Sequence, residues 1–407
     1  MNKVLGEVVA WIDERYPISD FLKEHLSQYY APKNFNFWYY FGALAMVVFA
    51  NQLLTGIWLT MNYVPSAEQA FASVEYIMRD VNYGWLLRYM HSTGASFFFI
   101  VIYCHIFRGL LYGSYKKPRE LVWLIGSSLF LLLMAEAFFG YLLPWGNMSF
   151  WGAQVITSLF GAVPFIGEWL VTFIRGDYNV SGVTLNRFFA LHVVAVPLAI
   201  AGLVFMHILT LHNVGSNNPD GVDIKKHKDA QGKPLDGIAF HPYYTLKDLV
   251  ALGVFFILFF SVVFFVPTVG GFFLEAPNFD PADALKTPEH IVPVWYMTPY
   301  YAILRAIPDK LMGVIAMFAS VMLIFFMPWL DKSPVRSMRY RGPISRFMLV
   351  SFVISFFALG YLGVKEPTAT RTLAARFFTV VYFAYFFLMP WYSRVDVTKT
   401  VPDRIRT

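Results

Sequence analysis

The sequence predicts an all-α polytopic membrane protein with eight transmembrane helices. The 407-residue chain is 57% hydrophobic and only 14% charged, with a mean hydropathy of +0.52. Such a composition is too apolar for a soluble globule. Eight apolar stretches can cross the ~30 Å hydrocarbon core of a bilayer, at residues 38–63, 83–112, 121–143, 187–211, 249–266, 312–330, 347–364 and 377–391.

Basic residues fix the expected topology. Most lysines and arginines lie in the two termini and in every second connection, so the positive-inside rule places both termini in the cytoplasm. The net charge of +6 and the pI near 9.1 therefore reflect topology, and we expect no nucleic-acid partner. Residues 1–34 are amphipathic and charged, so we expect a membrane-surface segment rather than a signal peptide.

Two of the predicted helices each carry two histidines at nearly equal spacing. His91 and His105 are 14 residues apart, which puts them ~21 Å apart along one helix face. His192 and His207 are 15 residues apart. Fifteen residues exceed four helical turns by roughly 60°, which still leaves both rings on one broad helix face. Both helices run from the outer to the inner side. We therefore expect His91 to pair with His192 near the outer face and His105 with His207 near the inner face.

Glycines on the first and third predicted helices repeat this spacing. Gly42 and Gly56 are 14 residues apart, as are Gly126 and Gly140. By depth, Gly42 and Gly126 should lie level with the inner histidines, and the other two with the outer histidines. Glycine lets a flat macrocycle approach the helix backbone, so we interpret the four as haem contacts. The alternative is that they are the small packing residues common in membrane helices.

The single cysteine limits the chemistry. With only Cys104, the chain can form no intrachain disulfide, no four-cysteine metal site and no C-x-x-C-H haem attachment. Any haem would be held non-covalently. Two long connections, at residues 144–186 and 267–308, are rich in aromatic and apolar residues. We expect the first to form short amphipathic helices in the interface, and both to cover a pocket for a hydrophobic ligand.

Long ordered motifs cover nearly the whole chain and resemble cytochrome b of the bc1 complex, the respiratory quinol:cytochrome c oxidoreductase, of bacterial type. The motifs are YGWLLRYMHSTGAS, HIFRGLLYGSY, GYLLPWGNMSFWGAQVITSLF, NRFFALH, LHNVGSNNPDG, FHPYYTLKD and PVWYMTPYYAILRAIPDKLMGV. An uninterrupted eight-helix chain is more similar to this subunit than to its split b6f counterpart.

The resemblance implies a Q-cycle in a bacterial inner membrane. Quinol would be oxidised at the outer face, with one electron leaving to a Rieske iron–sulfur protein. The other would cross two non-covalent b-type haems, bL and bH, to reduce quinone at the inner face. Cytochrome c1 and a second copy of the complex are the further partners implied. Residues 35–213 would form the four-helix haem-binding bundle, and residues 214–407 would complete the quinone sites.

The resemblance also implies site residues. His91 and His192 would ligate bL iron, and His105 and His207 bH iron. Arginines would pair with haem propionates, although interfacial snorkelling is the alternative. The alternative for the polar residues of the inner quinone site is that they simply lie at a helix end. The alternative for the aromatic residues of the outer quinol site is an interface belt. The implied sets are Arg88 and Arg108 for the propionates; His212 and Asp248, as proton donors, with Ser216 and Lys247 for inner quinone; and Tyr141, Gly152, Pro293, Trp295, Tyr296 and Tyr301 for outer quinol.

Two departures from the family pattern stand out. Val294 replaces the glutamate of the usual Pro-Glu-Trp-Tyr motif, so the carboxylate expected to accept a quinol proton is missing. Glu289, Glu275 or His290 could take its place, and we consider Glu289 first because it lies five residues upstream. The second departure is the 15-residue histidine spacing, where the bc1 family has 14, and we expect a slight rotation of His207.

Two other functions are compatible with buried histidines. A transporter could use them as proton relays, but it would bind no haem and usually carries an internal repeat with broken helices, which the sequence does not show. A dihaem membrane anchor of another dehydrogenase would lack the two quinone pockets.

Overall fold

The computed structural model describes residues 3–23 and 28–405, which form an almost entirely helical chain. Within these residues, seven helices are long and apolar enough to cross a membrane, or eight spans if the bent pair α16 and α17 counts as one. In lipid, helices satisfy their backbone hydrogen bonds internally, which is why long apolar stretches adopt this structure. The prediction of an all-α polytopic membrane protein is confirmed.

The spans follow the predicted order with shifted ends. The fifth and the last differ most: the fifth begins at Phe240 rather than at residue 249, and the last begins at Ala369 rather than at residue 377 and is bent by 60° at its end. Pro390 fits the first turn of α17 but cannot continue α16. The helices are α3 (Tyr40–Thr60), α5 (Gly84–Tyr112), α6 (Glu120–Leu142), α9 (Gly182–Ala190) continued by a π turn (Leu191–Ala195) and α10 (Val196–Val214), α11 (Phe240–Phe265), α13 (Lys310–Met322) continued by η8 (Leu323–Phe326) and α14 (Met327–Leu330), α15 (Pro343–Val364), α16 (Ala369–Phe387) and α17 (Met389–Val395).

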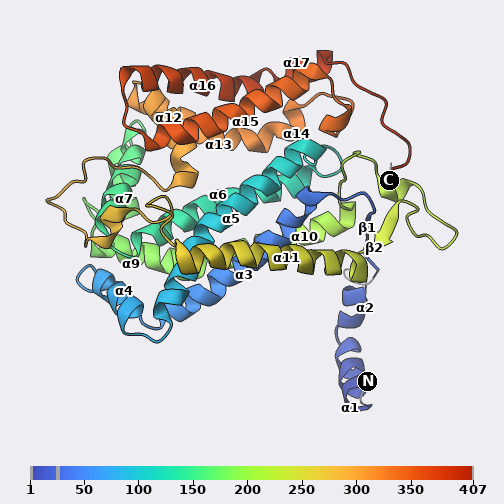
Figure 1. Cartoon of the computed structure of the whole chain (residues 1–407), viewed down its shortest axis with the longest axis horizontal. Helices are drawn as coiled ribbons and strands as arrows, with labels where there is room; N and C mark the ends of the chain where they lie inside the picture. The colour runs from blue at the N-terminus through green and yellow to red at the C-terminus, as the bar shows by residue number, and fades with distance from the viewer. Residues whose placement is uncertain (1–2, 24–27, 406–407) are drawn as a thin grey trace.

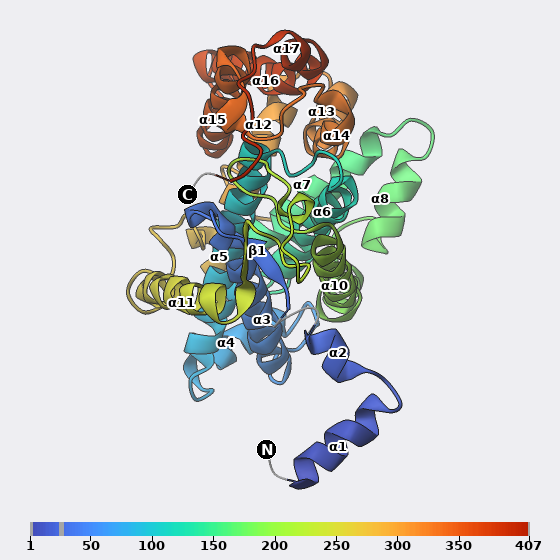
Figure 2. The same cartoon turned by 90° about the vertical axis from the view of Figure 1, so that its right-hand side faces the viewer.

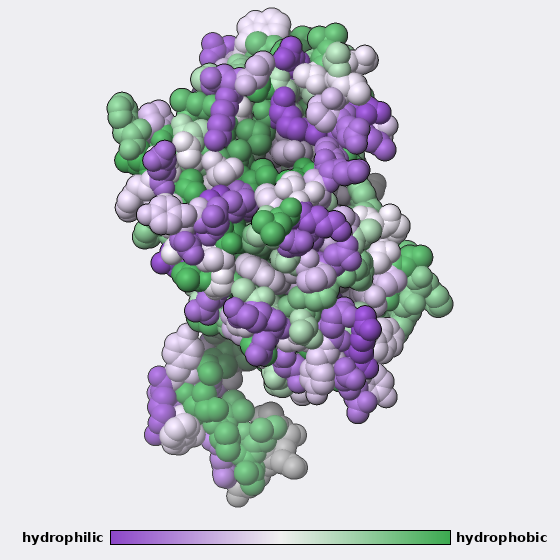
Figure 3. Space-filling view, turned by 90° about the vertical axis from the view of Figure 1, so that its left-hand side faces the viewer, coloured by the Kyte–Doolittle hydropathy of each residue, from purple (hydrophilic) through white to green (hydrophobic). Residues whose placement is uncertain are grey.

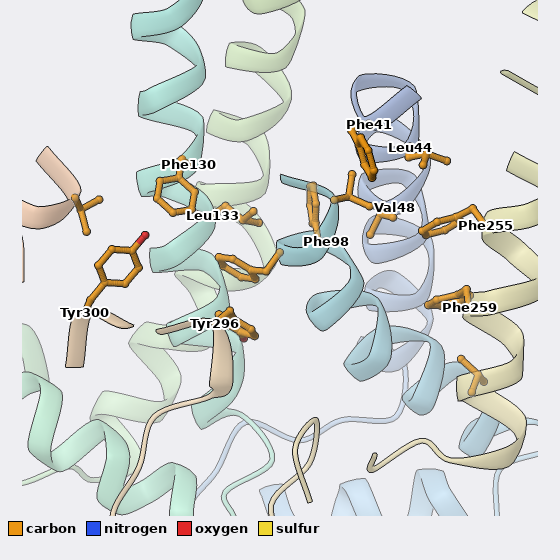
Figure 4. Packing of buried hydrophobic residues seen from close by; sticks show 14 residues of the cluster. Phe41, Leu44, Val48, Phe98, Phe130, Leu133, Phe255, Phe259, Tyr296 and Tyr300 are labelled. Carbon is orange, nitrogen blue, oxygen red and sulfur yellow. The ribbon is translucent and has the colours of Figure 1, made fainter. Parts of the chain in front are cut away.

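The spans pack in two groups. In the first group α3 lies along α5, and α6 lies along α9 and α10, while α11 covers α3 and α5 (Figure 1). In the second group α12 to α17 pack on one another as a separate layer, which Figure 2 shows above the first. Aromatic and aliphatic side chains join the first group to the start of the second, as Figure 4 shows for Phe41, Leu44, Val48, Phe98, Phe130, Leu133, Phe255, Phe259, Tyr296 and Tyr300.

Short helices gather at one end of the bundle. The connection that follows α6 contains α7 and α8, as predicted, and the connection that follows α11 leads into α12. Seen from this end, the surface mixes hydrophilic and hydrophobic residues (Figure 3). The elements in the connections are α4 (Ala70–Arg79), α7 (Asn147–Leu159), η3 (Phe160–Ala162), α8 (Gly167–Arg175), η6 (Ala276–Phe279), η7 (Trp295–Met297) and α12 (Thr298–Ala306).

The first and last described residues lie at the opposite end (Figure 1). There β1 (Tyr30–Pro32) pairs antiparallel with β2 (Gly237–Ala239), and the Asp236 carboxylate accepts two hydrogen bonds from Arg404, at 2.6 and 2.9 Å. These contacts join both ends of the chain to the connection that precedes α11. The smaller elements here are α1 (Lys3–Asp13), α2 (Ile18–Leu22), η2 (Phe37–Tyr39), η5 (Ile224–Lys226) and η9 (Met338–Tyr340).

The predicted surface segment begins with two helices, α1 and α2, and ends in the strand β1. Val4, Leu5, Val8 and Trp11 leave an exposed apolar face on α1, which projects away from the bundle (Figure 1). An unpacked amphipathic helix suits a membrane surface. Residues 1–2 and 24–27 of the predicted segment lie outside the described residues.

Candidate functional site

Two pairs of histidine rings face each other between α5 and the α9–α10 helix. The ring centres of His91 and His192 are 6.1 Å apart, and those of His105 and His207 are 6.3 Å apart. A metal bound by one nitrogen of each ring, at about 2.0 Å per bond, places the ring centres roughly 6 Å apart. The histidines pair as the helix directions predict, and both gaps fit one iron atom.

A π turn compensates for the longer spacing on the second helix. His192 lies within this turn, Leu191–Ala195, where one extra residue is accommodated without advancing the helix face. The 15 residues from His192 to His207 therefore turn through about the same angle as 14 α-helical residues. The expected rotation of His207 is removed, and its ring faces His105.

Hydrogen bonds fix the tautomer of the outer histidines. The Thr55 hydroxyl donates to the Asn51 carbonyl at 2.6 Å, so its oxygen accepts the Nδ1–H of His91 at 2.9 Å. Nδ1 of His192 lies 3.0 Å from both the backbone oxygen and Oε1 of Glu136. Because these partners are acceptors, Nδ1 carries the proton on both rings and the Nε2 lone pair is left for a metal.

Each predicted glycine lies beside one histidine, at the level its spacing predicts. A Cβ at Gly126 would come 3.1 Å from Cε1 of His207, and one at Gly140 would overlap the His192 ring, 2.8 Å from Nε2. The backbone thus approaches all four imidazoles, and at Gly140 a side chain would collide with the ring. The pairs are Gly42 with His105, Gly56 with His91, Gly126 with His207 and Gly140 with His192.

The two predicted arginines lie on α5, near its two histidines. Arg88 lines the cavity that surrounds His91. Arg108 lies over the Phe35 and Tyr112 rings, and its buried Nε has no hydrogen-bond partner among the described residues. Buried guanidinium groups rarely stay unpaired, so the position of Arg108 suits an anionic group that completes the site.

A cavity of about 480 Å³ surrounds the outer histidines and continues to the connection after α11. It is lined by His91, His192, Tyr141, Val294 and Tyr296, among others. The lining therefore joins the outer histidine pair to residues predicted for quinol. Such a continuous, mainly apolar space suits a flat macrocycle and a hydrophobic substrate side by side.

Glu275 is not part of the cavity lining, but its carboxylate is bonded to two residues that are, Tyr141 and Asn278. Its Oε2 accepts a hydrogen bond from the Tyr141 hydroxyl at 3.1 Å and one from Asn278 Nδ2 at 3.2 Å. Burial raises the pKa of Glu275 above its ordinary value, which suits a proton acceptor. Glu289 is exposed and lies outside the described cavity lining, while His290 Nε2 lies 3.3 Å from the Val364 carbonyl.

The remaining outer residues support the pocket from behind. The Trp295 indole donates to Ser96 Oγ at 3.1 Å, and the Tyr301 hydroxyl donates to the Ile291 carbonyl at 3.2 Å. Gly152 leaves room for the Tyr141 ring, 3.6 Å from where a Cβ would lie. Gly152, Pro293, Trp295 and Tyr301 are not part of the described cavity lining.

At the inner end the structure adds a residue that the sequence did not indicate. The Tyr29 ring stacks on His212, with ring centres 4.3 Å apart, and its hydroxyl lies 2.7 Å from Ser216 Oγ. Burial raises the pKa of Tyr29, so the hydroxyl stays protonated. Tyr29 thus joins two of the four predicted inner residues.

The other two predicted inner residues lie on α11. Asp248 faces Tyr39, and its buried Oδ1 has no hydrogen-bond partner among the described residues. Lys247 is exposed and donates to the Tyr243 hydroxyl at 2.8 Å. Asp248 therefore presents a buried carboxylate, and Lys247 is directed to the surface.

Comparisons with known proteins identify the family. Residues 26–215 match the family model described as cytochrome b/b6/petB, and residues 281–383 match that of cytochrome b(C-terminal)/b6/petD. The chain is 58% identical to cytochrome b of Allochromatium vinosum over 100% of both chains, and 49% identical to that of Rickettsia typhi over 99% of this chain and 98% of the relative.

Two further relatives are larger or structurally known. A protein of Bradyrhizobium diazoefficiens named cytochrome b/c1 is 47% identical over 98% of this chain, which matches 56% of that protein. A chain of a solved hyperthermophilic respiratory Complex III has a TM-score of 0.87 and 39% identity, covering 95% of this chain and 99% of that one. Together with the four facing histidines, these matches show that the chain belongs to the cytochrome b family.

Proposed function

We propose that the chain is the core electron-transfer subunit of a quinol:cytochrome c oxidoreductase, the bc1 complex. It would oxidise quinol at the end of the bundle that carries α7 and reduce quinone at the end that carries the sheet. The observation that most directly supports this function is the presence of two facing imidazole pairs at two depths, each with a gap that fits iron. A ladder of two such sites allows electrons to cross the membrane.

Two b-type haems would be held without a covalent bond, one at each histidine pair, and each supplies a reversible one-electron carrier. His91 and His192 would hold the outer haem, with Gly56 and Gly140 beside its ring. The inner haem would take His105 and His207, with Gly42 and Gly126 beside its ring. Arg88 and Arg108 would pair with the propionates, which the unpartnered Nε of Arg108 supports.

At the outer quinol site Glu275 would take the proton that Val294 cannot accept. Its contact with Tyr141 and its raised pKa support this role over one for the exposed Glu289. Tyr296 would form the wall beside Tyr141. Trp295 and Tyr301 would hold this wall in place through the contacts described above, with Gly152 and Pro293 beside them in the two connections.

At the inner quinone site His212 and Asp248 would donate protons to the quinone carbonyls. Ser216 and Tyr29 would bind a carbonyl through their paired hydroxyls, 2.7 Å apart. Lys247 would act from the surface, where it could deliver protons rather than touch quinone. The buried, unpartnered Oδ1 of Asp248 supports a ligand at this place.

The proposal also includes the partners of the chain and the membrane that contains it. Rieske iron–sulfur protein and cytochrome c1 would be its partners, in a complex that contains two copies of the chain. The fused name of the Bradyrhizobium relative supports cytochrome c1. The membrane would be a bacterial inner membrane with both termini cytoplasmic, which the excess of basic residues at that end supports.

The test is a redox titration of the visible difference spectrum of the purified complex. Wild type, His91→Ala and His105→Ala would be compared, with His227→Ala as a control because His227 pairs with the surface residue Asp403. We expect two b-type components in the wild type and in the control, and each of the other variants should lose one component. Absence of any haem signal in folded protein would refute the proposal and favour a proton-coupled transporter.

A further inference from the structure

Glu136 is a carboxylate in the middle of an apolar span. Between Leu121 and Leu142 of α6 it is the only acidic or basic residue. A charged group within the hydrocarbon core is costly and usually faces the protein interior, where it has a function. Glu136 follows this rule, because its side chain is 16% exposed and lines the cavity around the outer histidines.

The carboxylate lies against one proposed haem ligand. Oε1 is 3.0 Å from Nδ1 of His192, while the buried Oε2 has no partner among the described residues. The backbone oxygen of Glu136 lies at the same distance from that nitrogen. The Nδ1–H of His192 is therefore shared between a carbonyl and a carboxylate.

The other three histidines have no such partner. His91 donates to the neutral Thr55 hydroxyl at 2.9 Å. Nδ1 of His105 and Nδ1 of His207 both lack a hydrogen-bond partner among the described residues. A carboxylate thus acts on only one of the four rings, and it acts at the outer site.

We propose that Glu136 is a positioning residue that lowers the reduction potential of the outer haem through His192. This inference rests on the proposed function, since it requires a haem between His91 and His192. A carboxylate that accepts a ligand's N–H raises the basicity of the ligand, and a more basic imidazole stabilises ferric over ferrous iron. The inner haem lacks this interaction, so an electron on the outer haem is favoured to move inward.

The experiment is a redox titration of the purified complex that resolves both haems. Glu136→Gln removes the charge and keeps the shape, and Glu136→Asp keeps the charge. Thr55→Val is the matched control, because it removes a neutral acceptor from His91. We expect Glu136→Gln to favour reduction of the outer haem at least tenfold, about 59 mV for a one-electron couple. The shift should be smaller in Thr55→Val, and the potential of the inner haem should stay unchanged.

The other outcomes of this experiment also test the inference about Glu136. An outer potential that is unchanged in Glu136→Gln, or that shifts equally in Thr55→Val, would overturn the inference. If Glu136→Gln fails to retain the outer haem, retention in Glu136→Asp would support a need for the charge, and loss in both would count against it. Absence of an outer haem in the wild type would instead refute the proposed function, so the two failures are distinguishable.

Discussion

Replacement of Gly140 by alanine should remove the outer haem and spare the inner one. A Cβ at this position would lie 2.8 Å from Nε2 and 2.9 Å from Nδ1 of His192, whereas unbonded atoms in contact are about 3.5 Å apart. Cε1 of the ring lies closer still, so the ring would have to move by more than roughly 0.7 Å, and metal–ligand distances tolerate only about 0.2 Å. Overpacking of this kind costs about 1–3 kcal/mol, which corresponds to roughly 5- to 150-fold weaker haem binding.

Gly56→Ala is the matched control for this prediction. It lies at the same level, but its Cβ would come no closer than 3.3 Å to His91, a contact that a shift of a few tenths of an ångström relieves. Haem content from the pyridine haemochrome and the resolved redox titration would measure both sites in each variant. Full retention of the outer haem in Gly140→Ala, with an unchanged potential, would refute the reasoning.

Three further predictions concern the quinone sites and stability. The pKa of Glu275 is raised, so the rate of quinol oxidation should fall as the pH drops through that pKa and the base is protonated. Glu275→Gln should lower the rate at least tenfold and abolish this fall at acidic pH. The control, Glu289→Gln, should leave the pH–rate profile unchanged. Tyr29→Phe should slow electron transfer from the inner haem to added quinone severalfold, because one hydrogen bond of about 1 kcal/mol is lost, without changing quinol oxidation in stopped-flow measurements. Arg341→Met should lower the free energy of unfolding by about 1–3 kcal/mol, because the buried Asp331 carboxylate loses its 2.6 Å ion pair but keeps Lys116, at 3.1 Å, and the Tyr115 hydroxyl. Adding Asp331→Asn should recover part of the loss in a thermal denaturation series.

The histidine pairing could be predicted because it depends on depth and direction alone. Spacing along each helix sets the depth of His91, His105, His192 and His207, and the charge bias of the connections sets the direction of both helices. Neither quantity requires knowledge of how the helices rotate against each other. The same reasoning matched the four glycines to their levels.

The proton acceptor could not be predicted in this way. Proximity along the chain favoured Glu289, five residues from Val294, but the connection after α11 is irregular and separation in sequence says little about distance there. The Asn278 side chain accepts from the Ser149 backbone on α7 and donates to Tyr141, and Glu275 bonds to both Tyr141 and Asn278, which line the cavity. The position of Glu275 depends on contacts between segments more than 120 residues apart.

The hydrogen-bond partners of the histidines also could not be predicted from residue spacing. Thr55 and Glu136 act because α3 and α6 are rotated to face the ligands, and rotation about a helix axis is set by packing rather than by depth. For Glu136 the sequence did contain a signal, since a single carboxylate within an apolar span indicates a function. Thr55 gives no such signal, because hydroxyl side chains in membrane helices commonly bond to their own backbone.

The π turn explains why one extra residue between His192 and His207 does not disturb the pairing of the histidines. Counted as a regular helix, the 15 residues from His192 to His207 overshoot four turns by roughly 60°, and 14 fall short by roughly 40°. The turn at Leu191–Ala195 accommodates the extra residue beside the ligand itself, so both helices present their histidines with the same twist. An insertion near a required pair is therefore tolerated where the backbone can widen locally, and the facing rings of His105 and His207, 6.3 Å apart, are the consequence.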